Sequence, residues 1–140
     1  MTSEASGMFD VNLTPQAPQE NIGDAGFGWM AIDKQFHGDL EAVSKGQMLA
    51  AGTDVPDSAG YVALERVAGS LQGRSGSFVL QHIGNMVRGV PALTITVVPD
   101  SGTGELVGLS GSMTITNLNG YHFYQFTYTL NEESSEEHAA

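Results

Sequence analysis

The sequence predicts an all-β domain, most simply a closed antiparallel barrel of eight strands with little or no helix. The first observation is composition: the 140 residues include 18 glycines, 41% are hydrophobic and only 15% are charged, as in a single turn-rich β domain with one core. The second is a succession of short, alternating apolar segments separated by turn signals. Eight such strands can close into a barrel whose interior holds side chains or one small ligand, and an open sandwich is the alternative.

The alternation of apolar and polar residues places the strands in order along the chain. They are expected over residues 8–13, 27–36, 40–52, two strands within 58–86, then 92–98, 105–117 and 121–130. The stretch 40–52 also has helix propensity, but Gly46 at its centre and the short turns on both sides favour a strand. The barrel domain is therefore expected to span residues 8–130, between a disordered tail at 1–7 and an acidic, disordered tail at 131–140.

The central segment, residues 58–86, reads as two long strands joined by a tight turn at Gln72-Gly73. A turn of even length pairs residues whose numbers sum to an odd number, which sets Glu65 opposite Leu80. Side chains alternate between the two faces of the hairpin, so both strands contribute mainly apolar residues to one face. That face carries Tyr61, Ala63, Glu65, Val67, Phe78, Leu80, His82, Gly84 and Met86. Glu65 and His82 are then diagonal neighbours, with Cβ atoms roughly 5–8 Å apart.

Glu65 and His82 are the candidate catalytic residues. In a lumen that excludes water, a carboxylate and an imidazole could act as general base and acid, for instance in isomerisation or cyclisation. The alternatives are a buried hydrogen bond that fixes the strand register, or a pair exposed at the barrel mouth. Lys34 shares a face with Ile32 and Phe36, where it would form a Schiff base, pair with an acid such as Glu65 or extend to a barrel end.

Aromatic and methionine side chains on the same strands would line or flank a cavity, which suits an apolar or aromatic ligand. With the inward lysine, the candidate ligand-binding residues are Lys34, Tyr61, Phe78, Met86, Tyr124, Phe126 and Tyr128, and Trp29 lies on a neighbouring strand. The alternative is that these side chains simply fill the barrel.

Composition and motifs exclude several classes of function. A net charge of −11 with only five lysines and arginines argues against binding to nucleic acid or to anionic membranes. No apolar run has transmembrane length and no signal segment is visible, so a cytoplasmic location is the expectation. His37, His82 and His122 lack the spacing of a metal site with Glu65, there is no cysteine, and no cofactor is indicated. Apolar residues on both faces of several strands predict a homo-oligomer.

Several segments resemble a bacterial family catalogued as domain-of-unknown-function family 3224. They are DKQFHGDLE (33–41), SKG (44–46), AGYVA (59–63), GRSGSF (73–78), LQH (80–82), VVPDSGTGEL (97–106) and HFY (122–124) with Tyr128. The resemblance covers about residues 9–130 and implies a closed eight-stranded barrel similar to the allene oxide cyclase barrel, of the calycin or lipocalin-like kind. It implies no agreed activity. Gln47, Gln125 and Trp29 depart from the pattern of the family.

Three functions remain open at this point. The chain could bind a small hydrophobic or aromatic molecule in its lumen. It could be an isomerase or cyclase that uses Glu65 and His82. It could also be a filled structural barrel that acts through oligomerisation.

Overall fold

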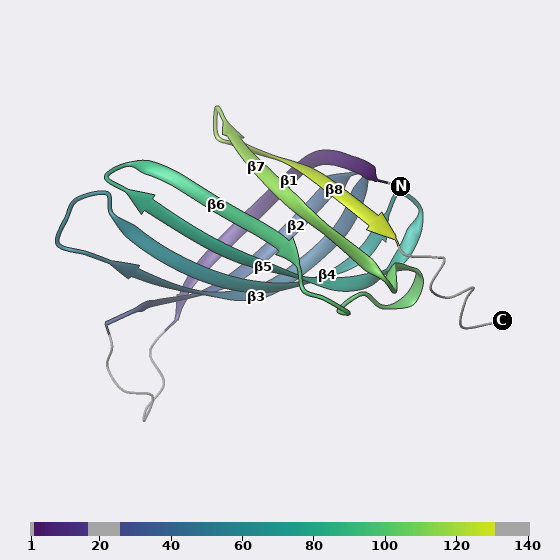
Figure 1. The fold of residues 1–140 in the computed structure, drawn as a ribbon, viewed down its shortest axis with the longest axis horizontal. Coiled ribbons are helices and arrows are strands. Elements are labelled where there is room, and N and C mark those ends of the chain that lie inside the picture. The colour runs from purple at the N-terminus through teal and green to yellow at the C-terminus, as the bar shows by residue number, and fades with distance from the viewer. Residues whose placement is uncertain (1, 17–25, 131–140) are drawn as a thin grey trace, which may run out of the picture.

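The computed structural model describes residues 2–16 and 26–130, and within them eight antiparallel strands close into a barrel (Figure 1). Each strand pairs with the next along the chain, and the first pairs with the last. The strands are β1 (Ser3–Gln16), β2 (Gly28–Gly38), β3 (Leu40–Gly52), β4 (Ala59–Leu71), β5 (Arg74–Val87), β6 (Val90–Val97), β7 (Leu109–Leu118) and β8 (Tyr121–Leu130). The predicted fold class is confirmed.

Helical structure in the described residues is limited to a short 3₁₀ turn, η1 (Gly104–Leu106). The expected strand over residues 105–117 is therefore wrong at its start, because β7 begins only at Leu109. The strand expected over residues 40–52 is confirmed as β3. None of the described helical residues form a helix with the length and apolar character needed to cross a membrane.

The disordered tail expected at residues 1–7 is wrong for residues 3–7, which are the first half of β1. This half pairs with β8, from Ser3 opposite Tyr128 to Phe9 opposite His122. Ala5 is 1% exposed, so the segment contributes to the core as well as to barrel closure. The acidic tail expected at 131–140 lies outside the described residues.

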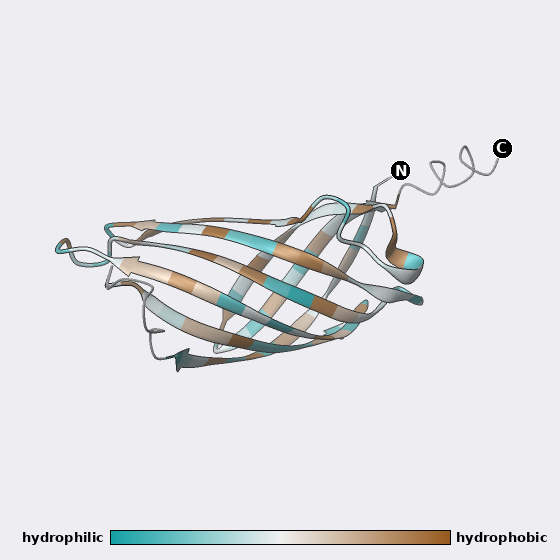
Figure 2. Ribbon diagram, turned by 90° about the horizontal axis from the view of Figure 1, so that it is seen from below, coloured by the Kyte–Doolittle hydropathy of each residue, from teal (hydrophilic) through white to brown (hydrophobic). Residues whose placement is uncertain are grey.

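The register predicted for the β4–β5 hairpin is confirmed, with Glu65 opposite Leu80 and Ala63 opposite His82. Gln72 and Gly73 have φ values of 45° and 87°, as a two-residue hairpin turn with two positive φ angles requires. The inward Ala63, Glu65 and Val67 of β4 are buried, whereas the outward Val62 is 51% exposed. Figure 2 shows the resulting alternation of hydrophobic and hydrophilic residues along the strands.

One end of the barrel, where β1 begins and β8 ends, is filled by a hydrophobic core (Figure 1). The rings of Phe78 and Phe126 stack with centroids 5.8 Å apart, and Phe126 stacks on Tyr128 at 5.3 Å. All three side chains are at most 6% exposed. We call this part of the molecule the closed end.

The loop between β6 and β7 seals the edge of β5 at the closed end. Its Ser101 and Thr103 hydroxyls and its Glu105 carboxylate accept hydrogen bonds from backbone N–H groups of β5, at 3.0 Å each. The backbone N–H of Thr103 also donates to Ser77 of β5 at 2.8 Å. The PDSGTGEL motif therefore provides partners for a strand edge that no neighbouring strand covers.

The opposite end is less complete, because β6 and β7 pair only at Ile95–Met113 and Thr96–Ser112. Towards the β5–β6 and β7–β8 turns the two strands diverge (Figure 1). Residues 90–94 of β6 and 114–118 of β7 have no ladder partner across this seam in the described chain. We call this part of the molecule the open end.

At Gly46, which lies directly opposite Glu65, β3 and β4 approach one another so closely that a side chain would not fit. A Cβ atom at Gly46 would lie 2.2 Å from the Leu64 carbonyl oxygen and 2.7 Å from the Glu65 Cα atom. Because backbone atoms cannot move aside, we expect Gly46→Ala to lower the free energy of unfolding by about 1–3 kcal/mol. Urea unfolding measures this change, with Gly52→Ala as control because nothing lies within 4 Å of a Cβ atom there. Equal stability of the two variants would contradict the described approach.

Candidate functional site

Four polar side chains from four consecutive strands meet inside the barrel. They are Lys34 on β2, Ser44 on β3, Glu65 on β4 and His82 on β5. The ladders explain the meeting: Lys34 lies directly opposite Ser44, and Glu65 lies two residues along β4 from the partner of Ser44. His82 is likewise two residues from the partner of Glu65. We call these four residues the Glu65 cluster.

Both carboxylate oxygens of Glu65 have partners. Oε1 accepts a hydrogen bond from the Ser44 hydroxyl at 2.8 Å. Oε2 lies 2.8 Å from the Lys34 ammonium nitrogen and 2.6 Å from Nε2 of His82. The exposed fractions of the Glu65, Lys34 and His82 side chains are 0%, 7% and 5%. The Lys34 ammonium also lies 4.8 Å from the centroid of the Phe9 ring, a cation–π contact that helps to hold it away from water.

The Glu65 carboxyl is held ionised by its neighbours. Burial alone raises its pKa, but the hydrogen bond from His82 and the charge and hydrogen bond of Lys34 outweigh burial and lower the pKa to about 2. A carboxylate with so low a pKa, and with both oxygens occupied, is a weak proton acceptor. The structure therefore favours Glu65 as the group that orients His82 rather than as the base itself.

His82 offers the proton-accepting atom that Glu65 does not. Because Nε2 faces an ionised carboxylate at 2.6 Å, it carries a hydrogen, and the neutral imidazole has its lone pair on Nδ1. No residue in the described chain bonds to Nδ1, and no buried side-chain nitrogen or oxygen there lacks a partner. Nδ1 is thus within reach of solvent, and because the ring is on the inward face, that solvent is in the lumen.

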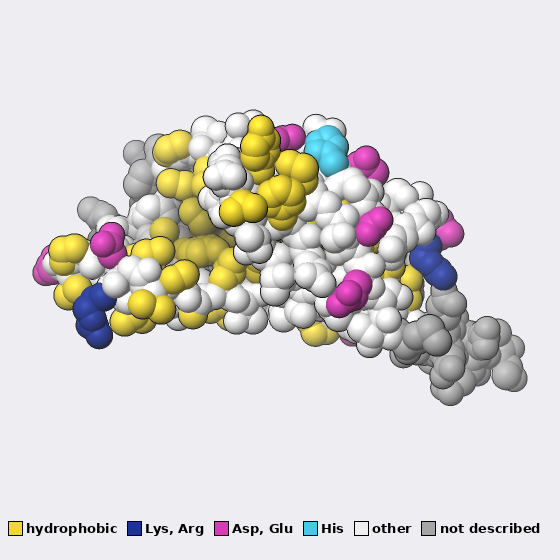
Figure 3. Space-filling model, turned by 90° about the horizontal axis from the view of Figure 1, so that it is seen from above, with side chains coloured by type: hydrophobic (Ala, Val, Ile, Leu, Met, Phe, Trp, Pro, Cys, Tyr) yellow, Lys and Arg dark blue, Asp and Glu magenta, His cyan; other side chains and the backbone are white. Residues whose placement is uncertain are grey.

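Inward side chains become more exposed from the Glu65 cluster towards the open end. Tyr61 lies across Gly84, where an added Cβ atom would be 2.2 Å from the Tyr61 ring. Burial, and then the charge of Glu65, raise the pKa of the Tyr61 hydroxyl. Leu93 and Met86 continue the inward faces of β6 and β5, yet they are 44% and 41% exposed. Figure 3 shows the surface hollowed beside a group of hydrophobic side chains, with more hydrophobic side chains on the floor of the hollow.

The structure separates the predicted site residues into two groups. Lys34, Tyr61, Glu65, His82 and Met86 lie in or above the Glu65 cluster, towards the open end. The four aromatic residues of the second group are packed into the core of the closed end. They are Phe78, Tyr124, Phe126 and Tyr128.

Ser44 is the member of the cluster that sequence reasoning missed. It lies at an even position of β3, on the inward face with Leu40 and Ala42. The alternation within residues 40–52 could have placed it in the lumen. A serine hydroxyl carries no distinctive sequence signal, however, and its role depends on the neighbouring Glu65.

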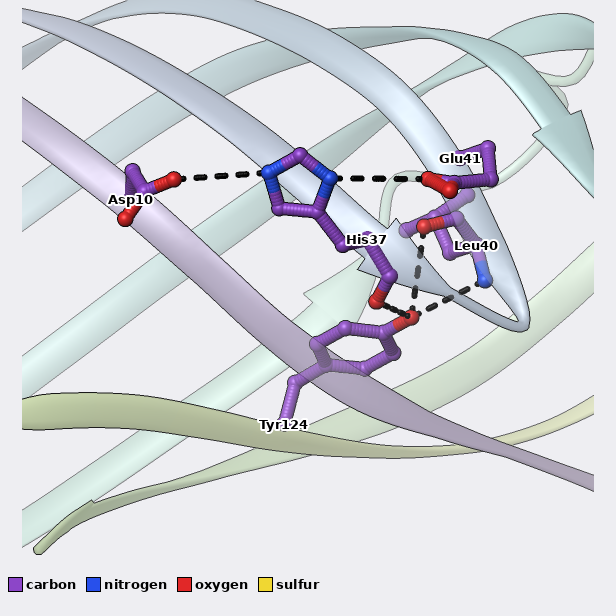
Figure 4. A network of polar contacts seen from close by, with 5 residues as sticks. All are labelled: Asp10, His37, Leu40, Glu41 and Tyr124. Carbon is purple, nitrogen blue, oxygen red and sulfur yellow. Dashed lines mark hydrogen bonds and ion pairs between the residues drawn. The ribbon is translucent and has the colours of Figure 1, made fainter.

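The other candidate groups lie away from the cluster. His37 is outside the barrel, with its imidazole between Asp10 at 3.3 Å and Glu41 at 3.7 Å (Figure 4). The same figure shows the Tyr124 hydroxyl, which accepts the Leu40 N–H at 2.9 Å and donates to the His37 carbonyl at 2.9 Å. Among the described residues, no group of three or more histidine, aspartate or glutamate side chains is placed to hold a metal ion.

Fold and site together define a small closed β-barrel that is packed at one end and holds a buried polar cluster beneath an apolar opening. The family model described as protein of unknown function (DUF3224) matches residues 5–128. The chain belongs to this family. No curated protein matches the chain.

A solved structure supports the same assignment. It is the crystal structure, at 1.84 Å resolution, of a protein with unknown function from the DUF3224 family of Shewanella oneidensis MR-1. It is 51% identical, covers 94% of this chain and 98% of its own, and superposes with a TM-score of 0.86.

The departures from the family pattern lie outside the lumen. Trp29 donates its indole N–H to Gln47 on the neighbouring strand at 3.2 Å, an exposed contact. Gln125 is exposed on β8 between the buried Tyr124 and Phe126, and therefore points outward. These three residues leave the composition of the Glu65 cluster unchanged.

The buried Lys34–Glu65 pair is testable by a double-mutant cycle. Glu65→Gln leaves the Lys34 ammonium buried without its counter-ion. Lys34→Met removes the ammonium partner of Glu65 and leaves His82 as its remaining basic partner. We expect each single change to lower the free energy of unfolding by about 3–5 kcal/mol, and the double variant to recover part of that loss. Urea unfolding of the four proteins gives the coupling energy.

The matched control is the exposed Lys45–Asp33 pair, which joins the same two strands as Lys34 and Ser44 at 3.0 Å. Its side chains are 85% and 49% exposed, so Lys45→Met should cost at most about 1 kcal/mol. A coupling energy for Lys34 and Glu65 no larger than that of the control pair would show that the Glu65 cluster does not form as described.

Proposed function

We propose that the barrel binds a small, mainly apolar molecule in the open half of its lumen, above the Glu65 cluster. The supporting observation is the contrast within one inward face. Leu80 and Phe78 on β5 are 0% and 1% exposed, whereas Met86 farther along the same face is 41% exposed. Inward apolar side chains that remain in contact with solvent cost free energy, and a bound apolar molecule would recover it.

The composition of the opening supports the same class of ligand. Tyr61, Met86 and Leu93 are on its inward face, and two further methionines, Met30 and Met48, are half-buried and directly opposite one another on β2 and β3. Methionine is flexible and polarisable, so it adapts to ligands of irregular shape. The polar atoms that remain are concentrated at the Glu65 cluster and Tyr61, where they could orient a ligand rather than supply most of its affinity.

A fluorescent probe tests this proposal. N-phenyl-1-naphthylamine is neutral, apolar and brightens when it leaves water, so we expect saturable binding to the wild-type protein. Ala50→Trp adds a large side chain on the inward face opposite Tyr61 and should weaken probe binding by at least about tenfold. Ala51→Trp adds the same side chain on the outward face and should leave binding unchanged.

Equal effects of Ala50→Trp and Ala51→Trp would move binding out of the lumen and contradict the proposal, as would a wild-type protein that does not bind the probe. Mass spectrometry of the denatured protein, before any probe is added, would identify a co-purified natural ligand. An apolar compound present in wild-type protein but depleted in Ala50→Trp would support the proposal directly.

An isomerase or cyclase is the second candidate function, and the orientation of His82 favours it. An imidazole with one nitrogen bonded to a carboxylate and the other facing the lumen has the arrangement of a general base. Glu65 would then hold the tautomer and stabilise the imidazolium.

We also propose that the chain self-associates through the outer wall of β3, β4 and β5. Leu49, Val62 and Ile83 lie directly opposite one another across these strands and are 43%, 51% and 48% exposed. Leu64, the next outward residue on β4, is 54% exposed. A continuous apolar row on an outer barrel wall is expected to be covered, and a second copy presents an identical row to it.

Sedimentation equilibrium tests self-association. Ile83→Lys places a charge in the row, and we expect it to weaken association by at least about tenfold because that charge would have to be buried. Thr116→Lys adds a charge to an exposed position of β7 away from the row and should have little effect. A wild-type protein that is monomeric at all accessible concentrations would contradict self-association.

A further inference from the structure

We propose that the molecule bound in the lumen carries a weakly acidic hydroxyl group, a phenol or an enol, and that Nδ1 of His82 accepts its hydrogen bond and its proton. This inference rests on the proposed binding function. It names the ligand class and the atom that recognises it. The steps below start from the groups that border His82.

The surroundings of His82 leave Nδ1 as the accepting atom of the cluster. Lys34 has only N–H donors, the Ser44 hydroxyl donates to Glu65, and both Glu65 oxygens already accept hydrogen bonds. The residues directly opposite His82 are Ala63 on β4 and Ile95 on β6, which have no polar side-chain atoms. A polar ligand group at Nδ1 must therefore bring the hydrogen itself.

Two other titratable side chains on the inward face, Tyr61 and His122, lie nearer the open end. Tyr61 lies on β4 towards the open end, and its raised pKa keeps its hydroxyl protonated. That hydroxyl has no partner in the described chain, so it can donate to a ligand oxygen. His122 on β8 stacks on Phe9 at 5.1 Å, with Lys34 over the same Phe9 ring.

Charge selects a hydroxyl over an acid that is already ionised. With neutral His82, the charges of Glu65 and Lys34 cancel, so the cluster has no excess positive charge to attract an anion. The whole chain carries −11 and repels one. A neutral hydroxyl enters without this penalty, and a carboxylate ligand would need a further proton from solvent.

Proton transfer within the complex is balanced. The ligand O–H bond breaks, an N–H bond forms at Nδ1, and the products are an oxyanion and an imidazolium. The imidazolium is stabilised by the 2.6 Å contact between Nε2 and the Glu65 carboxylate. The Lys34 ammonium contacts the same carboxylate oxygen and so lies close to the new charges. The negative charge of the oxyanion and the positive charge of the imidazolium cancel, so proton transfer leaves the net charge of the complex unchanged.

Two probes of nearly equal shape test the inference. 4-Nitrophenol has the acidic hydroxyl, and 4-nitroanisole carries a methyl group in place of that proton. We expect wild-type protein to bind 4-nitrophenol at least about tenfold more tightly than 4-nitroanisole, the difference that one hydrogen bond to a polar group supplies. In mildly acidic buffer, where free 4-nitrophenol is protonated, the bound probe should show the yellow absorbance of the nitrophenolate.

Variants locate the effect at His82. His82→Gln should bring the affinity ratio of 4-nitrophenol to 4-nitroanisole, compared within that variant, to about one and abolish the nitrophenolate absorbance. Glu65→Gln should reduce both signals, because the imidazole loses the carboxylate that fixes its tautomer. Circular dichroism and urea unfolding establish that each variant is folded before binding is measured.

Nitrogen-15 NMR of histidine-labelled wild-type protein tests the orientation without any variant. We expect the neutral tautomer of His82 with hydrogen on Nε2 and a free lone pair on Nδ1. The opposite tautomer overturns the inference, and so does equal affinity of wild-type protein for the two probes. In the latter case the proposed lumen binding stands if 4-nitroanisole binds. If neither probe binds, the inference fails, and the binding of N-phenyl-1-naphthylamine decides separately on the proposed function.

Discussion

The ionised carboxylate of Glu65 is the constraint on which the rest of the barrel interior depends. Removal of a charge from water costs several kcal/mol, and that cost is offset only by well-placed partners. The partners come from β2, β3 and β5, so the cluster forms only when four consecutive strands are in register. A slip of one residue in any of these pairings would turn a partner to the outside, which makes the cluster a strong determinant of register.

The Glu65 cluster also lies at the boundary between the packed closed end of the barrel and its solvent-exposed open end. Towards the closed end, the inward aromatic rings are stacked and buried, with Phe78 and Phe126 1% and 0% exposed, and the β6–β7 loop seals the edge of β5. Towards the open end, β6 and β7 lose their pairing, and Leu93 is 44% exposed. A polar group is least costly where packing gives way to solvent, and a ligand entering from the open end would reach the cluster first.

The sequence pattern of one hairpin was enough to predict that Glu65 and His82 are neighbours. The position of Glu65 relative to His82 follows from a side-chain period of two and a turn of even length, both visible in the hairpin. The choice between a pair and a nucleophile for Lys34 needed the β2–β3 and β3–β4 registers, which the turns alone do not give. The strand predicted over residues 8–13 was too short at its start, because residues 3–7 are ordered by pairing with β8, more than a hundred residues away, and not by their own alternation.

Glu65 and His82 have different roles, and the difference follows from the contacts that stabilise the cluster. The same contacts that make a buried carboxylate tolerable also lower its pKa to about 2, so Glu65 cannot be both the anchor of the register and an effective base. His82 is then the proton acceptor, because no residue in the described part of the chain bonds to its second ring nitrogen, Nδ1. A cluster that forms primarily for stability thereby presents one basic atom to the lumen, in a fixed tautomer and with its counter-ion already in place.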